Sequence, residues 1–174
     1  MKGRIVLNFG ENLLIGVVSG IVASMFFTVI LLLVKPKIKV SDKICYDSDN
    51  KIHRIKIVNK TCYMLTNIRY KLFYCKIHGD GIITIEEIEP RKSPIICISK
   101  YDFFDKDANY AYRISYDIDF NKYPMDKNTK LEFIFIADHA VSNTTKCVKR
   151  DYFEEDIWEG VFESGASTKI IRKV

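Results

Sequence analysis

One uninterrupted apolar segment near the N-terminus constrains this chain most. Residues 13–34 read LLIGVVSGIVASMFFTVILLLV and contain no charged side chain. An α-helix of that length spans about 33 Å, which matches a bilayer hydrocarbon core of about 30 Å. Pro36 follows at a position where it would stop a helix. The segment therefore predicts a transmembrane helix, preceded by a short flank, residues 1–12.

Two other uses of an apolar helix fit the segment less well. A buried core helix normally keeps a polar face, and this segment has none. A cleaved signal peptide has a shorter apolar region, of about 7–15 residues, followed by a small-x-small cleavage site. The residues after the segment, Val34-Lys35-Pro36-Lys37, offer no such site. We therefore expect an uncleaved, single-pass anchor in the lipid bilayer.

The basic residues beside the anchor predict its orientation. Two basic residues, Lys2 and Arg4, precede it, whereas four lysines follow it closely, namely Lys35, Lys37, Lys39 and Lys43. An excess of Lys and Arg marks the cytoplasmic flank of a membrane helix, so we expect the C-terminal domain in the cytoplasm. Most of the net charge of +5 lies in this flank. A nucleic-acid binder carries a basic face across its domain, so we expect no nucleic-acid partner.

The cysteine pattern points to the same compartment. The chain has five cysteines, an odd number, and no two of them are spaced C-x-x-C. A disulfide framework normally uses an even number of cysteines, and a zinc ribbon or thioredoxin-like site needs the missing spacing. We therefore expect reduced thiols in a reducing compartment.

Small residues recur along the predicted helix at a spacing of four. They are Gly16, Gly20, Ser24 and Thr28. Residues four apart lie on one face of a helix, and small side chains there let two helix backbones approach closely. The pattern predicts packing of this face on a second copy or on a partner helix.

The remaining residues, 35–174, predict one soluble β domain. Apolar and polar residues alternate with a period of two through residues 68–74, 114–120 and 131–135, which is typical of strands with one buried face. Further strands are expected at 37–45, 51–58, 81–88, 95–99, 145–152 and 168–172, with one short helix near 152–160. The fold class is mainly β: one N-terminal helix, then an antiparallel sandwich or barrel of about eight or nine strands. The early first strand also predicts that the domain lies near the lipid surface.

Motifs for catalysis, metals and cofactors are missing. No H-E-x-x-H, G-x-S-x-G, P-loop or G-x-G-x-x-G sequence occurs, and the three histidines lie far apart. The segment beginning at Asp105 starts like a calcium loop, but its sixth and twelfth positions are Tyr110 and Tyr116, where that loop requires Gly and Glu. We expect no catalytic residues, no metal and no cofactor, and thus no enzyme.

An acidic, aromatic segment is the best candidate for a partner surface. Residues 151–163 read DYFEEDIWEGVFE and include the single tryptophan. Aromatic side chains framed by charges can form a binding surface. The candidate surface residues are Tyr152, Glu154, Glu155 and Trp158; the alternative is that the aromatics belong to the core.

Two functions follow from this layout. The first is a non-catalytic, membrane-anchored β domain that binds an unknown protein or small molecule at the cytoplasmic membrane surface. The second is a ligand-sensing membrane effector, defence- or toxin-like, that oligomerises through its transmembrane helix. The layout is similar to that of small bacterial defence effectors that pair membrane helices with a ligand-binding β-barrel, although those effectors have more than one membrane helix.

Overall fold

The computed structural model describes residues 2–33, 35–79, 81–92 and 94–172. The predicted end of the apolar helix at Val34 lies outside these described residues. The chain divides into two compact units, Met1–Lys35 and Pro36–Val174.

The first unit is a single helix, α1 (Lys2–Leu33). It begins earlier than residue 13, so the predicted flank before the apolar segment is itself helical. Within it, Phe9–Leu31 is long and apolar enough to cross a membrane, and none of its most apolar window is buried by protein. A core helix of a soluble protein would be covered by other elements. This helix therefore could insert in a membrane, as an anchor or as a signal sequence.

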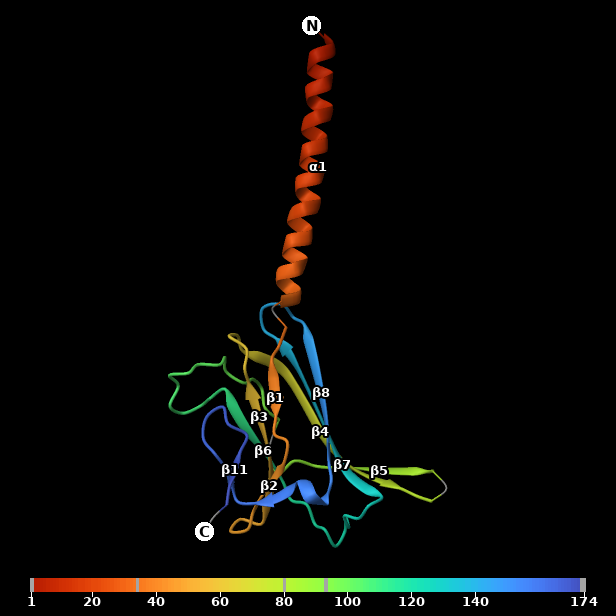
Figure 1. Ribbon diagram of the computed structural model, residues 1–174, viewed down its shortest axis with the longest axis vertical. Helices are drawn as coiled ribbons and strands as arrows, with labels where there is room; N and C mark the ends of the chain where they lie inside the picture. The colour runs from red at the N-terminus through yellow and green to blue at the C-terminus, as the bar shows by residue number, and fades with distance from the viewer. Residues whose placement is uncertain (1, 34, 80, 93, 173–174) are drawn as a thin grey trace. The chain divides into compact units, whose positions relative to one another are not determined.

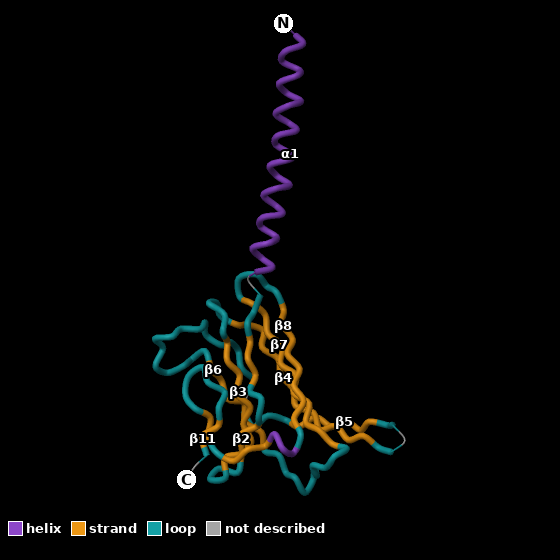
Figure 2. The backbone as a smooth tube through the Cα atoms, in the orientation of Figure 1, coloured by secondary structure: helices purple, strands orange, loops and turns teal. Residues whose placement is uncertain are grey.

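The second unit contains two main sheets, drawn as arrows in Figure 1 and in orange in Figure 2. The first sheet is built around β3 (Ile52–Asn59). β1 (Ile38–Val40) and β2 (Ile44–Asp47) pair in succession along one edge of β3, and β6 (Ala111–Tyr116) pairs along the other. β9 (Ile157–Glu159) joins β2 in parallel, whereas the other pairs are antiparallel.

The second sheet is antiparallel throughout. Its strands, in spatial order, are β5 (Ile83–Ile88), β4 (Leu65–Ile77), β7 (Thr129–His139) and β8 (Thr145–Tyr152). The register of β4 against β7 shifts between Thr66 and Arg69, where Asn67 has a positive φ of 48°. This irregularity is a β-bulge, and it bends the long strand β4.

The sheets pack face to face over one apolar core. Its largest members, all less than 2% exposed, include Tyr116, Tyr152, Phe133, Phe135, Leu72 and Ile55. The sheets also approach each other at their edges. The Tyr152 hydroxyl of β8 donates to the Ser41 carbonyl between β1 and β2 at 2.7 Å, and Pro90 bridges Tyr116 of β6. The result is a sandwich that is partly closed, as a half-barrel.

The C-terminal segment begins with the 3-10 turn η1 (Glu154–Asp156), which leads into β9 at the edge of the first sheet. A hairpin of β10 (Val161–Phe162) and β11 (Ile170–Ile171) follows, and its carbonyls accept hydrogen bonds from Lys56 and Arg113 of the first sheet. Gly160 enters this hairpin with φ of 147°, and a Cβ there would lie 2.3 Å from the Ile171 carbonyl oxygen. Only glycine fits this close approach.

The structure confirms the predicted fold class of an N-terminal helix followed by a mainly antiparallel β domain. Eleven strands occur among the described residues because the predicted strand 37–45 is split in two and short strands form after residue 156. Two local predictions were wrong. Residues 95–99 form only one bridge, Leu65 to Ile98, and the expected helix near 152–160 is a three-residue turn followed by β9.

Candidate functional site: a groove beside β4

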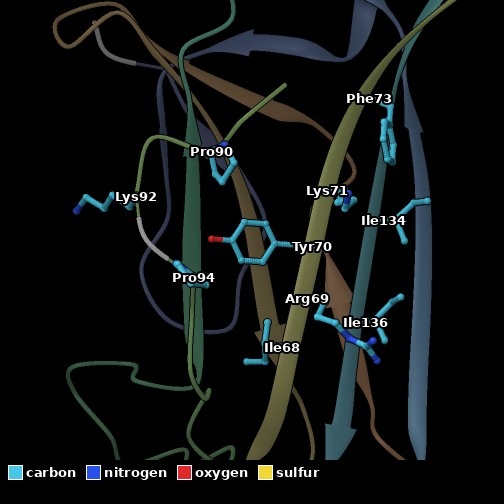
Figure 3. Close-up of a pocket in the computed structure, with 10 residues that line it drawn as sticks. All are labelled: Ile68, Arg69, Tyr70, Lys71, Phe73, Pro90, Lys92, Pro94, Ile134 and Ile136. Atoms are coloured by element: carbon cyan, nitrogen blue, oxygen red, sulfur yellow. The ribbon is translucent and has the colours of Figure 1, made fainter. Parts of the chain in front are cut away.

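A groove of about 560 Å³ lies along the middle of β4 (Figure 3). Its lining comes from β4, β7 and the segment after β5: Ile68, Arg69, Tyr70, Lys71, Phe73, Pro90, Lys92, Pro94, Ile134 and Ile136. In Figure 3, Tyr70 extends toward Pro90 and Pro94 on one side of β4, whereas Phe73 and Ile134 lie on the other side. The groove therefore passes over an edge of the second sheet.

The groove exists because β5 leaves this edge early. β5 pairs with β4 only as far as Ile88 opposite Leu72, and the chain next contacts that edge at the Ile98 bridge to Leu65. Proline has no N–H for a strand ladder, so Pro90 favours this departure. Among the described residues, no strand pairs with the intervening part of β4 on this side. An open strand edge thus forms part of the groove.

Two isoleucines make the outer face of the second sheet unusually apolar. The outward positions of a two-layer sheet are normally polar, yet β7 places Ile134 and Ile136 there, and both are half-buried. Lys71 lies opposite Ile134, and Arg69 lies opposite Ile136. The aliphatic stems of these basic side chains can cover the isoleucines while their charged ends stay in water.

The charged rim of the groove is basic. Lys71 donates to Glu87 at 2.8 Å, so that pair is neutral overall. For Arg69 and Lys92, no ion pair within 4 Å is found among the described residues, and Lys92 is exposed. Burial raises the pKa of Tyr70, so the phenol that lines the groove stays neutral. The groove combines apolar walls with the exposed Lys92 and with Arg69, whose charge helps to lower the pKa of Asp138.

The predicted partner surface is only partly at the surface. Tyr152 is fully buried in the core, so it takes no part in such a surface. Glu154 and Glu155 are exposed, and Trp158 is 42% exposed. The Trp158 ring lies under Lys43 Nζ at 5.2 Å and under the Arg172 guanidinium carbon at 5.9 Å. Cation–π contacts of this kind hold the indole against the domain and reduce what it offers to a partner.

The four lysines of the predicted membrane flank separate into two groups. Lys35 and Lys37 are exposed and Lys39 is half-buried. Lys43 is instead paired with Asp156 at 2.7 Å, beside Trp158. Lys43 therefore serves the contact between β2 and the C-terminal segment. The structure thus brings together Lys43 and Trp158, which the sequence suggested for separate roles.

The small residues of α1 form one continuous strip. Gly16, Gly20, Ser24 and Thr28 line the same shallow groove along the helix. The Ser24 hydroxyl donates to the Gly20 carbonyl at 2.9 Å, and the Thr28 hydroxyl donates to the Ser24 carbonyl at 2.8 Å. Both hydroxyls form hydrogen bonds within their own helix, so the strip consists of small side chains and these two hydroxyls do not need a partner from another helix.

The histidines have structural surroundings. His53 is buried between Tyr46 and Phe120, with ring centroids 4.8 and 5.0 Å away, and burial lowers its pKa to about 4. His139 is buried at the end of β7, where its Nδ1 accepts the backbone N–H of Ser142 at 3.1 Å. His78 is exposed in the turn after β4.

One serine–histidine contact was not anticipated from sequence. Ser142 Oγ lies 3.1 Å from His139 Nδ1, the distance of a nucleophile and its base. The same nitrogen also accepts backbone amides of the turn, and the neighbouring Asp138 binds Thr145 and Asn67 instead of the ring. The contact therefore closes the turn between β7 and β8.

A buried lysine fixes the C-terminal hairpin. Lys56 is 1% exposed, and its Nζ donates to the Glu163 carbonyl at 2.6 Å. Burial, together with nearby Arg113, lowers the pKa of Lys56 to about 8. Beside it, the Cys45 thiol donates to the Gly160 carbonyl at 3.0 Å, and burial raises its pKa to about 11. A thiol with a raised pKa is a poor nucleophile, and both side chains bond carbonyls of the C-terminal segment.

Metal ligands are not assembled within the described part of the chain, where no group of three His, Cys, Asp or Glu side chains could hold an ion. In the calcium-like segment, Asp105 accepts the backbone N–H groups of Asp107 and Asn109. Its carboxylate therefore shapes its own loop. All five cysteines are free.

No protein-family model matches the chain, and no curated protein matches its sequence at a significant level.

Proposed function

We propose that the protein is a non-catalytic, membrane-anchored binding module. In this proposal α1 holds the chain in a bilayer, and the groove beside β4 takes the ligand. The observation that carries the proposal is the groove itself, which has outward-facing isoleucines beside Arg69 on one side of β4 and Tyr70 with the segment of Pro90, Lys92 and Pro94 on the other. The outward positions of a two-layer antiparallel sheet are commonly polar, so two isoleucines there favour a binding role for this face.

The groove fits a small ligand with an apolar body and a negative charge. Its volume of about 560 Å³ lies within the usual range of about 300–1,000 Å³ for small-molecule sites. Arg69 is suited to a carboxylate, phosphate or sulfonate because a guanidinium offers two parallel donors. The apolar body would lie against Ile134, Ile136 and Tyr70.

A cytoplasmic location for the domain is part of the proposal. It is supported by the lysines that follow α1 and by the five free thiols. The non-catalytic character is supported by the turn-closing role of His139 and the apolar surroundings of His53.

A second candidate is a membrane effector that oligomerises through α1. The observation in its favour is the strip of small residues from Gly16 to Thr28, which would let two helices approach closely. In this version, a ligand in the groove would control assembly in the bilayer.

The proposal is tested with the full chain in lipid nanodiscs and a defined anionic probe, naphthalene-2-sulfonate. Its neutral match is naphthalene-2-methanol, and empty nanodiscs report partition into lipid. Saturation-transfer NMR is expected to show protein-dependent binding of the sulfonate in preference to the alcohol. Replacing both Arg69 and Lys92 by Gln should weaken that binding at least tenfold, or about 1.4 kcal/mol. Lys127→Gln, at an exposed turn away from the groove, is the matched control.

Equal signals from the chain and from empty nanodiscs would contradict binding in the groove. Equal affinity for the two probes would contradict the anionic ligand class while leaving the apolar groove intact.

A further inference from the structure

One end of the β domain is formed by three loops that meet where the chain enters the first sheet (Figure 1). The loops are residues 59–64, 95–110 and 139–144. The Lys37 amide donates to Thr61 Oγ1 at 2.9 Å, and the Tyr101 amide donates to the Thr61 carbonyl at 2.8 Å. The Ala140 amide donates to the Met64 carbonyl at 3.1 Å. These bonds join the three loops into a single surface, which we name the entry end.

The entry end exposes large apolar side chains in every loop. They are Tyr63, Met64, Ile96, Phe103, Phe104 and Val141. Phe103 and Phe104 are 79% and 86% exposed, and their rings contact each other at 5.7 Å. Burial of an aromatic ring is favourable, so two adjacent exposed rings would be stabilised by contact with an apolar environment outside the domain.

Exposed lysines of the β domain lie in or next to the segments that form the entry end. They are Lys37, Lys60, Lys100, Lys106 and Lys146. The loop 101–110 also carries Asp102, Asp105 and Asp107, of which Asp102 and Asp105 accept hydrogen bonds from backbone amides of that loop. Exposed aromatic rings with lysines in the neighbouring segments match an anionic lipid surface, which attracts nearby Lys and Arg side chains.

We propose that the entry end is a lipid-contacting surface. Phe103 and Phe104 enter the headgroup region, and the neighbouring lysines contact anionic headgroups. This inference rests on the membrane anchoring proposed above. The last described residue of α1 is Leu33 and the β domain begins at Pro36, and three residues of chain reach at most about 10 Å. The entry end, to which Lys37 is joined through Thr61, therefore follows the proposed anchor directly along the chain.

The opposite end of the domain provides an internal comparison. There the hairpin between β4 and β5 also exposes isoleucines, Ile77, Ile82, Ile83 and Ile85. β4 pairs with β7 from Leu65 opposite His139, at the entry end, to Lys76 opposite Thr129. Thirteen residues of strand separate the two ends by about 40 Å. Lipid contact at the entry end thus predicts no lipid contact at the hairpin.

Depth-dependent fluorescence quenching tests the inference on the full chain. The chain is placed in nanodiscs that contain anionic lipid and lipids brominated near the headgroup end of the acyl chain or, for the probe in α1, near its methyl end. Trp158→Phe removes the native tryptophan while keeping a ring, and single tryptophans then replace Phe104, Ile85 or Val22. Val22 lies within the apolar stretch of α1 and reports insertion of the helix. The β signal in circular dichroism verifies that each variant is folded.

We expect quenching at Val22 and at Phe104, with at least twice as much quenching at Phe104 as at Ile85. Quenching at Val22 without quenching at Phe104 would overturn the lipid-contacting surface and leave the anchor standing. Equal quenching at Phe104 and Ile85 would also overturn it, because no particular end would then face lipid. An unquenched Val22 probe would refute the anchor and, with it, this inference.

Discussion

His53 should make the β domain sensitive to acid. The ring is 3% exposed, it lies between Tyr46 and Phe120, and neither ring nitrogen has a hydrogen-bond partner among the described residues. Burial lowers its pKa from 6.5 to about 4, against a smaller opposing effect of Asp117. Protonation of the ring is therefore less favourable in the folded chain than in the unfolded chain.

The direction of the pH effect follows from proton binding. Well above pH 6.5 the ring is neutral in both the folded and the unfolded chain, so it does not change the free energy of unfolding. Between pH 6.5 and about 4, the unfolded chain binds a proton that the folded chain does not, so the free energy of unfolding falls as the pH falls. The full loss is about 3 kcal/mol, of which about 2.5 kcal/mol falls between pH 7 and pH 4.5.

Urea unfolding of the full chain in nanodiscs, followed by Trp158 fluorescence, measures this loss. His53→Phe removes the titration and keeps an aromatic ring between Tyr46 and Phe120. The variant should lose about 2.5 kcal/mol less than the unmodified chain between pH 7 and pH 4.5. His78→Gln, at an exposed histidine, should behave like the unmodified chain. If the His53→Phe variant and the unmodified chain lose the same stability on acidification, the account of His53 is refuted.

Three further predictions concern other parts of the molecule. Gly160→Ala should cost about 1–3 kcal/mol in urea unfolding, because its Cβ would clash with the Ile171 carbonyl, whereas Gly79→Ala, with open space around it, should cost far less. Trp158→Ala should cost no more than about 1 kcal/mol in the same assay, because the ring is 42% exposed, whereas Phe133→Ala in the core should cost about 3–5 kcal/mol; equal losses would place the indole in the core. Gly20→Leu should weaken self-association in a membrane two-hybrid assay, and Val22→Leu, outside the small-residue strip, should not; an unchanged signal for Gly20→Leu would exclude packing through this strip.

The sequence predicts those parts of the fold that depend on local patterns. The uncharged run from residue 13 onward and the alternation in residues 68–74 and 131–135 are such patterns, and the structure has α1 through Leu33 and the strands β4 and β7 there. Pairing between distant segments leaves no such pattern. The parallel contact of β2 with β9 joins residues more than a hundred positions apart, and the sequence therefore did not reveal it.

The groove could be predicted only in part. The run Phe133-Ile134-Phe135-Ile136 is apolar at consecutive positions, which indicates a strand covered on both faces, and it marks β7 as unusual. The contribution of Pro90, Lys92 and Pro94 depends on where β5 leaves the edge of β4, which local sequence does not fix. Tyr152 and Trp158 show the same limit, since they lie six residues apart in one acidic segment, yet one is in the core and the other is at the surface.

The central claim is that this chain is a membrane-anchored binding module that keeps its N-terminal helix. The most direct measurement is alkaline carbonate extraction of membranes from cells that make the full chain with an epitope before Met1 and a second epitope after Val174. The account predicts that both epitopes remain on one polypeptide of full mass in the carbonate-resistant pellet. Release of the C-terminal epitope into the supernatant, on a fragment that lacks the N-terminal epitope, would show a cleaved signal sequence and contradict the account.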